Sequence, residues 1–91
     1  MNSEQRMAEI QSRLESSLNA ETVQVDDEGH RHVGHEGAKD GRGHFRVLVI
    51  SAQFEGKTPI QRHRLVYQAM GELMQTDIHA LAIEAYTPAE L

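Results

Sequence analysis

The stretch HFRVLVISAQFEGKTPIQ, residues 44–61, decides the fold of this 91-residue chain because it joins a buried strand to a helix start. Residues 44–51 carry large apolar side chains in alternation, which predicts a strand with two apolar faces. Residues 54–57 read as a turn. A threonine cap, a proline at the first helical position and a glutamine three residues after the cap then predict a helix start at Thr58-Pro59-Ile60-Gln61.

Working outward from this stretch, apolar residues at steps of three and four predict one helix on each side. The downstream helix is expected to run to about Met74, although Gly71 inside it weakens it by about 1 kcal/mol relative to alanine. The upstream helix begins at a cap on Asn2 or Ser3. The two predicted apolar stripes are Met7, Ile10, Leu14 and Leu18 upstream, and Val66, Ala69, Met70 and Leu73 downstream.

Two further strands and a helical stub complete the expected order. Residues 22–26 alternate with Val23 and Val25 inward, and residues 78–86 place Leu81, Ile83 and Ala85 on one face. The first two strands should form a hairpin. The sequence therefore predicts an α+β domain over residues 1–91, with a three-stranded sheet, helices packed on one face, and the order αββαβ plus a short C-terminal helix.

The segment between the first two strands, residues 28–43, differs from the rest of the chain. It contains five glycines and three histidines, and Val33 is its one large apolar residue. This composition predicts a flexible loop. Connections of this length are uncommon in small domains and are often functional.

Composition excludes several classes of function. The absence of cysteine excludes a disulfide framework, a catalytic thiol and a self-contained cysteine metal site. The N-terminal segment 1–13 has no apolar signal-peptide core, and no apolar run approaches the roughly 20 residues that span a bilayer. We expect a cytoplasmic protein without a membrane partner. The net charge of −5 repels phosphate, so nucleic-acid binding would need a local basic patch.

Four motifs in order along the chain resemble the BolA family. They are the run 43–47 (GHFRV), the turn 54–56 (FEG), the helix segment 61–67 (QRHRLVY), and the strand start 78–81 (IHAL) followed by Thr87-Pro88. The resemblance implies a class II KH-like fold. It also implies a non-enzymatic protein that is a monomer alone and forms a heterodimer with a monothiol glutaredoxin. The pair would share a two-iron two-sulfur cluster with glutathione, in cluster transfer or in iron or redox regulation.

The resemblance assigns histidines as cluster ligands. A two-iron cluster needs four ligands, and histidines can replace two cysteines on one iron. Without thiolates the chain could supply only the histidine side, and it would hold no cofactor when alone. His79 matches the family's ligand, although a lone strand histidine is by itself more often structural. His32 matches the loop ligand best and His35 is the second choice, while a solvated loop whose histidines bind nothing explains the segment equally well.

Basic residues near the second helix start give an alternative function. Lys57, Arg62, His63 and Arg64 could contact an acidic partner, glutathione carboxylates or phosphate, although an ordinary charged helix face explains them as well. Some bacterial members of the family are described as transcriptional regulators, so weak DNA binding is the alternative. We expect His63 to be partly buried at the sheet edge and His44 to be a structural strand residue near the loop.

RNA binding and catalysis are less well supported. A KH domain binds single strands through a GxxG loop. Residues 34–37 (GHEG) have that spacing but lie between the first two strands, and residues 56–59 (GKTP), at the expected place, lack the second glycine. The sequence has no nucleophile motif, no phosphate loop and no paired carboxylates in a plausible pocket.

Overall fold

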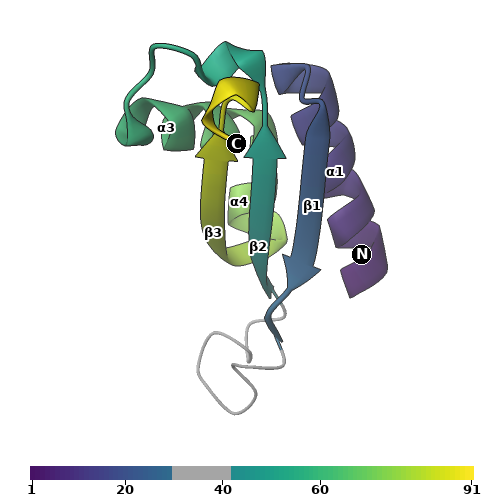
Figure 1. Cartoon of the computed structure of the whole chain (residues 1–91). Helices are drawn as coiled ribbons and strands as arrows, with labels where there is room; N and C mark the ends of the chain where they lie inside the picture. Colours follow the sequence, from purple (N-terminus) through teal and green to yellow (C-terminus); the bar gives the residue numbers. More distant parts are fainter. Residues whose placement is uncertain (30–41) are drawn as a thin grey trace.

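The computed structural model describes residues 1–29 and 42–91 and shows a three-stranded sheet with both long helices on one face (Figure 1). Strands β1 and β2 form an antiparallel hairpin, and β3 pairs parallel to β2 at the other side, in the order β1-β2-β3. The predicted α+β order is confirmed. The elements are α1 (Ser3–Leu18), β1 (Thr22–Asp27), β2 (Gly43–Ile50), η2 (Ala52–Phe54), α3 (Pro59–Met70), α4 (Leu73–Thr76), β3 (Ile78–Tyr86) and η3 (Pro88–Glu90).

The core lies between the helices and the inner face of the sheet. In the predicted apolar stripe of α1, Ile10, Leu14 and Leu18 are buried and Met7 is partly buried against the core. The inner face of β2 is buried too, so both patterns are confirmed. Phe54 in η2 is also fully buried, although it belongs to neither periodic pattern. The buried side chains that dominate the core are Ile10, Leu14, Phe45, Val47, Val49, Phe54, Val66, Met70 and Ile78.

The caps that the sequence predicts are present at both long helices. Asn2 caps α1, and its side chain and that of Gln5 exchange hydrogen bonds with each other's backbone N–H. Thr58 and Gln61 do the same at α3, with Pro59 in the first turn. The N–H groups in the first turn of a helix have no preceding turn whose carbonyls could accept their hydrogen bonds. Reciprocal caps supply the missing acceptors and so fix where each helix begins.

The second long helix ends earlier than the sequence predicts. The expectation of one helix to about Met74 is wrong, because α3 ends at Met70 and Leu73–Thr76 forms the separate turn α4. Gly71 is the cause. It adopts φ 57° and ψ −131°, a backbone conformation that residues other than glycine rarely adopt. Its N–H donates a hydrogen bond to the carbonyl of Tyr67. The glycine therefore stops the helix and turns the chain toward β3.

The hairpin base extends further than predicted at both ends. Gly43 belongs to β2 and not to the connecting segment, and the N–H of Glu28 donates to the carbonyl of His44 at 2.8 Å. The Glu28 carboxylate also meets the Arg46 guanidinium at 3.1 Å. The predicted loop ligands His32 and His35 lie outside the described residues, as does the segment 34–37. Among the described residues, no helix is long and apolar enough to cross a membrane.

Candidate functional site

His79 lies in a β-bulge at the start of β3. The parallel register pairs Gly43 with Ile78 and His44 with Ala80, so His79 is an extra residue that has no paired residue on β2. A bulge of this kind re-aims a side chain. Ile78 is fully buried, whereas His79 is exposed.

The bulge brings His79 beside His44. The two imidazole rings are tilted by 45° with their centroids 4.9 Å apart. His44 neighbours the buried Phe45 on β2 and is itself half-buried. Sequence reasoning gave His44 a structural role and missed this pairing, because the two residues are 35 positions apart and the register shift that aligns them has no signal in the sequence.

A contact with Arg42 bears on which nitrogen of the His79 ring carries the proton. The guanidinium of Arg42 lies 3.2 Å from Nδ1 of His79. A guanidinium has donors only, so the contact requires Nδ1 to accept and assigns the ring proton to Nε2. A metal that binds through Nε2 of a neutral ring needs the proton on Nδ1, and one that binds through Nδ1 needs its lone pair. Ligation through either nitrogen therefore requires Arg42 to move away.

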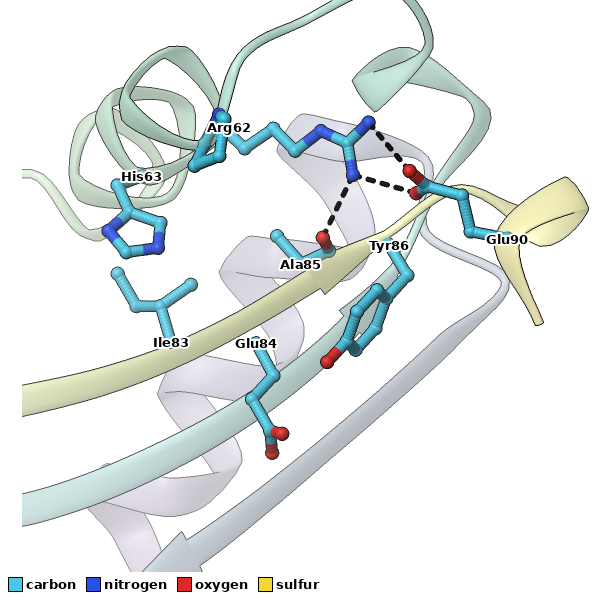
Figure 2. Close-up of a pocket in the computed structure, with 8 residues that line it drawn as sticks. Arg62, His63, Ile83, Glu84, Ala85, Tyr86 and Glu90 are labelled. Carbon is cyan, nitrogen blue, oxygen red and sulfur yellow. Dashed lines mark hydrogen bonds and ion pairs between the residues drawn. The ribbon is translucent and has the colours of Figure 1, made fainter.

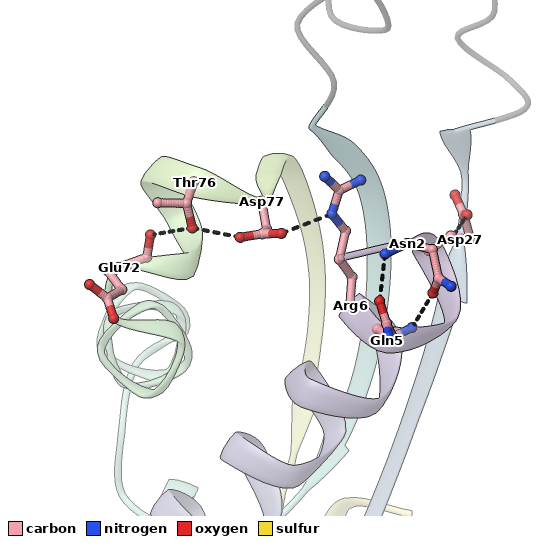
Figure 3. A network of polar contacts seen from close by, with 8 residues as sticks. Asn2, Gln5, Arg6, Asp27, Glu72, Thr76 and Asp77 are labelled. Atoms are coloured by element: carbon pink, nitrogen blue, oxygen red, sulfur yellow. Dashed lines mark hydrogen bonds and ion pairs between the residues drawn. The ribbon is translucent and has the colours of Figure 1, made fainter.

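A polar clamp centred on Asp77 holds the bulge in place (Figure 3). The Asp77 carboxylate accepts hydrogen bonds from Thr76 at 2.6 Å and from Arg6 of α1 at 3.0 Å, and these bonds lower the pKa of Asp77. Its carbonyl accepts from the N–H of Gly43 at 2.9 Å. One residue thus ties α1, the start of β2 and the start of β3 together, two positions before His79.

The described residues can provide imidazole ligands here but not a complete metal site. Within residues 1–29 and 42–91 no group of three or more histidine, cysteine or acidic residues is placed to hold a metal ion. The chain contains no cysteine at all.

A second polar cluster lies at the far end of β3 (Figure 2). Arg62 of α3 forms a two-pronged ion pair with Glu90 of η3, at 2.7 and 3.2 Å, and it also donates to the carbonyl of Ala85 at 3.1 Å. Its guanidinium carbon lies 5.9 Å from the centre of the Phe54 ring. Arg62 is therefore engaged within the chain and differs in this respect from the surface residue that the sequence suggests.

The Arg62–Glu90 pair predicts an acid sensitivity. Hydrogen bonds from Arg62 and from the Thr87 backbone lower the pKa of Glu90 from its usual 4.5 to about 2. The folded pKa is below the unfolded one, so the stabilisation is complete above about pH 4.5 and is lost as the pH falls toward 2. We expect Glu90→Gln to lower the urea midpoint at pH 7 and to have little effect at pH 2. Glu55→Gln, at an exposed site, is the control, and an equal Glu90 effect at both pH values would contradict this prediction.

The other basic residues lie in the N-terminal half of α3 or just before it. Lys57 and Arg64 border one shallow hollow and are both exposed, so the predicted basic patch consists of these two side chains. His63 is exposed, so the expectation that it is partly buried is wrong. It faces β3 on the other side of the helix (Figure 2). These residues lie at the end of the sheet opposite His79.

Comparisons with known proteins place this geometry in one family. The model of the BolA-like protein family matches residues 14–90. The chain belongs to the BolA-like family. BolA-like protein 1 of Bos taurus is 45% identical over 83 residues, which cover 91% of this chain and 59% of the relative, so the chain spans about three fifths of that relative's length.

Two other BolA-like proteins extend the comparison. The BolA domain of SufE1 from Arabidopsis thaliana has a solved structure that matches with a TM-score of 0.84 at 35% identity, covering 100% of this chain and 99% of that one. The DNA-binding transcriptional regulator BolA of Haemophilus influenzae is 30% identical over 89% of this chain and 76% of its own length. The predicted family and α+β fold are confirmed.

Proposed function

We propose that this BolA-like protein is a non-enzymatic partner of a monothiol glutaredoxin, with which it shares a histidine-ligated two-iron two-sulfur cluster. The observation that carries the proposal is the exposed His79, turned out by a β-bulge beside His44 at one end of the sheet. The SufE1 relationship supports a role in iron–sulfur biology, since a BolA domain there belongs to a protein named SufE-like. In this role the chain is a monomer without cofactor until its partner binds.

The ligand chemistry divides between the two proteins. Two-iron clusters take four ligands, and imidazoles can occupy two of them on one iron. His79 supplies one imidazole. The second comes from His32 or His35, as the family resemblance implies, or from His44, which already lies against His79. The partner's thiol and glutathione supply the sulfur ligands, which this chain lacks.

The proposal is tested by adding this protein to a cluster-loaded monothiol glutaredoxin and recording visible absorption and circular dichroism. Replacing a sulfur ligand by nitrogen alters the charge-transfer bands of the iron, so we expect a new spectrum that saturates at one chain per glutaredoxin. Apo-glutaredoxin in the same titration controls for changes without a cluster. A spectrum that stays unchanged at millimolar excess would disprove shared ligation.

DNA binding is the alternative function, favoured by the name of the Haemophilus influenzae relative and by the exposure of Lys57 and Arg64. Two exposed cations on a chain of net charge −5 give weak and strongly salt-dependent binding. A duplex-binding assay across a salt series separates the two functions. Binding that is lost in Lys57→Ala and Arg64→Ala, together with an unchanged cluster spectrum, would favour the regulator.

The cytoplasmic location that the sequence suggests also stays a prediction.

A further inference from the structure

The outer edge of β3 is open within the described part of the chain. No strand among residues 1–29 and 42–91 pairs with that edge. The carbonyl of Tyr86 faces the β2 side, where the N–H of Ser51 donates to it, whereas the carbonyl of Ala85 faces outward to Arg62. Backbone groups alternate in direction along a strand, so those of Leu81 and Ile83 face outward with Ala85.

This edge lacks the usual protection against strand pairing. Edge strands commonly carry prolines, lysines or inward-facing charges that prevent association with other chains. β3 is nine residues long, and the segment 80–85 reads ALAIEA, without proline or lysine. Its one charged side chain, Glu84, points away from the helices (Figure 2). The edge is therefore suited to accept another strand.

A hollow of about 270 Å³ runs beside this edge, between α3 and β3. Pro59 and His63 border it on the helix side and Ile83 borders it on the strand side. Figure 2 shows the imidazole of His63 directed from α3 toward Ile83. The N-terminal half of α3 thus flanks the place that a fourth strand would occupy.

Two apolar side chains of α3 are exposed. Ile60 is 64% exposed and Tyr67 is 41% exposed. These residues and His63 are spaced at i, i+3 and i+7, so they form one stripe on the helix. A fourth strand beside β3 would lie next to the N-terminal part of this stripe. One additional strand beside β3 would therefore contact the open edge, the hollow and this part of the exposed stripe together.

We propose that an extended segment of a partner protein binds between α3 and β3 and adds to the β3 edge as a fourth strand. The kinds of side chain that this segment carries follow from the residues that it would meet on each face of the sheet. Side chains toward α3 meet Ile60, Tyr67 and Ile83 and are apolar. Side chains on the other face lie next to Glu84, whose side chain is 44% exposed. Glu84 and Glu28 both pair with Arg46, so two carboxylates share one cation there and the added side chains are basic. The segment therefore alternates apolar residues with lysine or arginine.

A nucleic-acid strand fits this groove less well. Two carboxylates, Glu84 and Glu90, line it, and its one guanidinium, Arg62, is held by Glu90. Phosphates would meet negative charge there. The groove lies along the second half of β3, whereas His79 lies at the start of the strand. This binding surface is separate from the cluster ligands and goes beyond the proposed function.

The test uses a synthetic eight-residue peptide of alternating valine and lysine, titrated into the ¹⁵N-labelled protein and followed by NMR. We expect saturable shifts of the Leu81 and Ile83 amides. The same peptide with an N-methyl group on every residue should not bind, because it lacks the backbone donors. Ile60→Ser with Tyr67→Ser should weaken binding by about tenfold or more, while Gln68→Ser, on another side of α3, should not change it.

Several outcomes would overturn the proposal. The first is the absence of shifts at Leu81 and Ile83 up to millimolar peptide, and the second is equal binding of the N-methylated peptide. Shifts at these amides that only a twelve-residue oligothymidine produces would assign the groove to nucleic acid. Shifts that depend on protein concentration without any peptide would assign the edge to a second copy of this chain.

Discussion

Replacing His79 with alanine is expected to leave the spectrum of cluster-loaded glutaredoxin unchanged when the variant is added. The β-bulge exposes this imidazole and places it at the edge of the sheet, where a partner can reach it. A methyl side chain in the same place can donate no electron pair. Because His79 is exposed, its loss should leave the core intact, and the thermal midpoint of the variant should stay within a few degrees of the parent.

His63→Ala is the matched control for this experiment. It also removes an exposed histidine, but from α3 at the other end of the sheet, and should leave the spectral change complete. His44→Ala separates two versions of the site. If His44 is the second ligand, this variant loses the change as His79→Ala does; if a loop histidine is, the change persists. A full spectral change with His79→Ala would remove the basis for the proposed ligand.

Replacing Phe54 with alanine is expected to have the largest effect on stability. Phe54 is fully buried in the core, and its ring also packs under the Arg62 guanidinium. Buried phenylalanine-to-alanine changes cost about 3–5 kcal/mol. Small domains have about 5–15 kcal/mol of stability in total, so the thermal midpoint should fall by roughly 15 °C or more.

Chemical denaturation measures this effect, with Ile60→Ala as the control. Ile60 is an apolar residue only a few positions away, but it is 64% exposed, so its truncation should change the unfolding free energy by less than about 1 kcal/mol. Equal losses from the two variants would mean that Phe54 is not part of the core.

The elements that sequence predicts well are those with strong periodicity or a chemical cap. The strand that contains Val47 and Val49 and the helix start at Thr58 follow from side-chain alternation and capping alone. Phe54 is different, because it is buried by a short 3-10 turn that has no periodic signal. Gly71 is another such case. Whether a glycine weakens a helix or ends it depends on the tertiary contacts that follow, so the boundary at Met70 could not be predicted from composition.

The candidate site is predictable only in part for a similar reason. The family resemblance points to His79, and the structure shows that its side chain is exposed. The position of His44 against it depends on a one-residue register shift between β2 and β3, which is a property of the pairing and not of either strand. For Arg62, the sequence suggests a role that the structure does not support. Its charge suggested a surface contact, but the Glu90 that engages it is 28 positions away.

Pulsed electron paramagnetic resonance of the reduced heterocomplex is the most direct test of ligation by this chain. The protein is labelled with ¹⁵N at histidine only and combined with unlabelled, cluster-loaded glutaredoxin, and the cluster is then reduced by one electron. The account predicts strong ¹⁵N hyperfine couplings, which are absent when the His79→Ala variant is used. A spectrum without ¹⁵N couplings would show that no imidazole of this chain binds the iron, and would contradict the account.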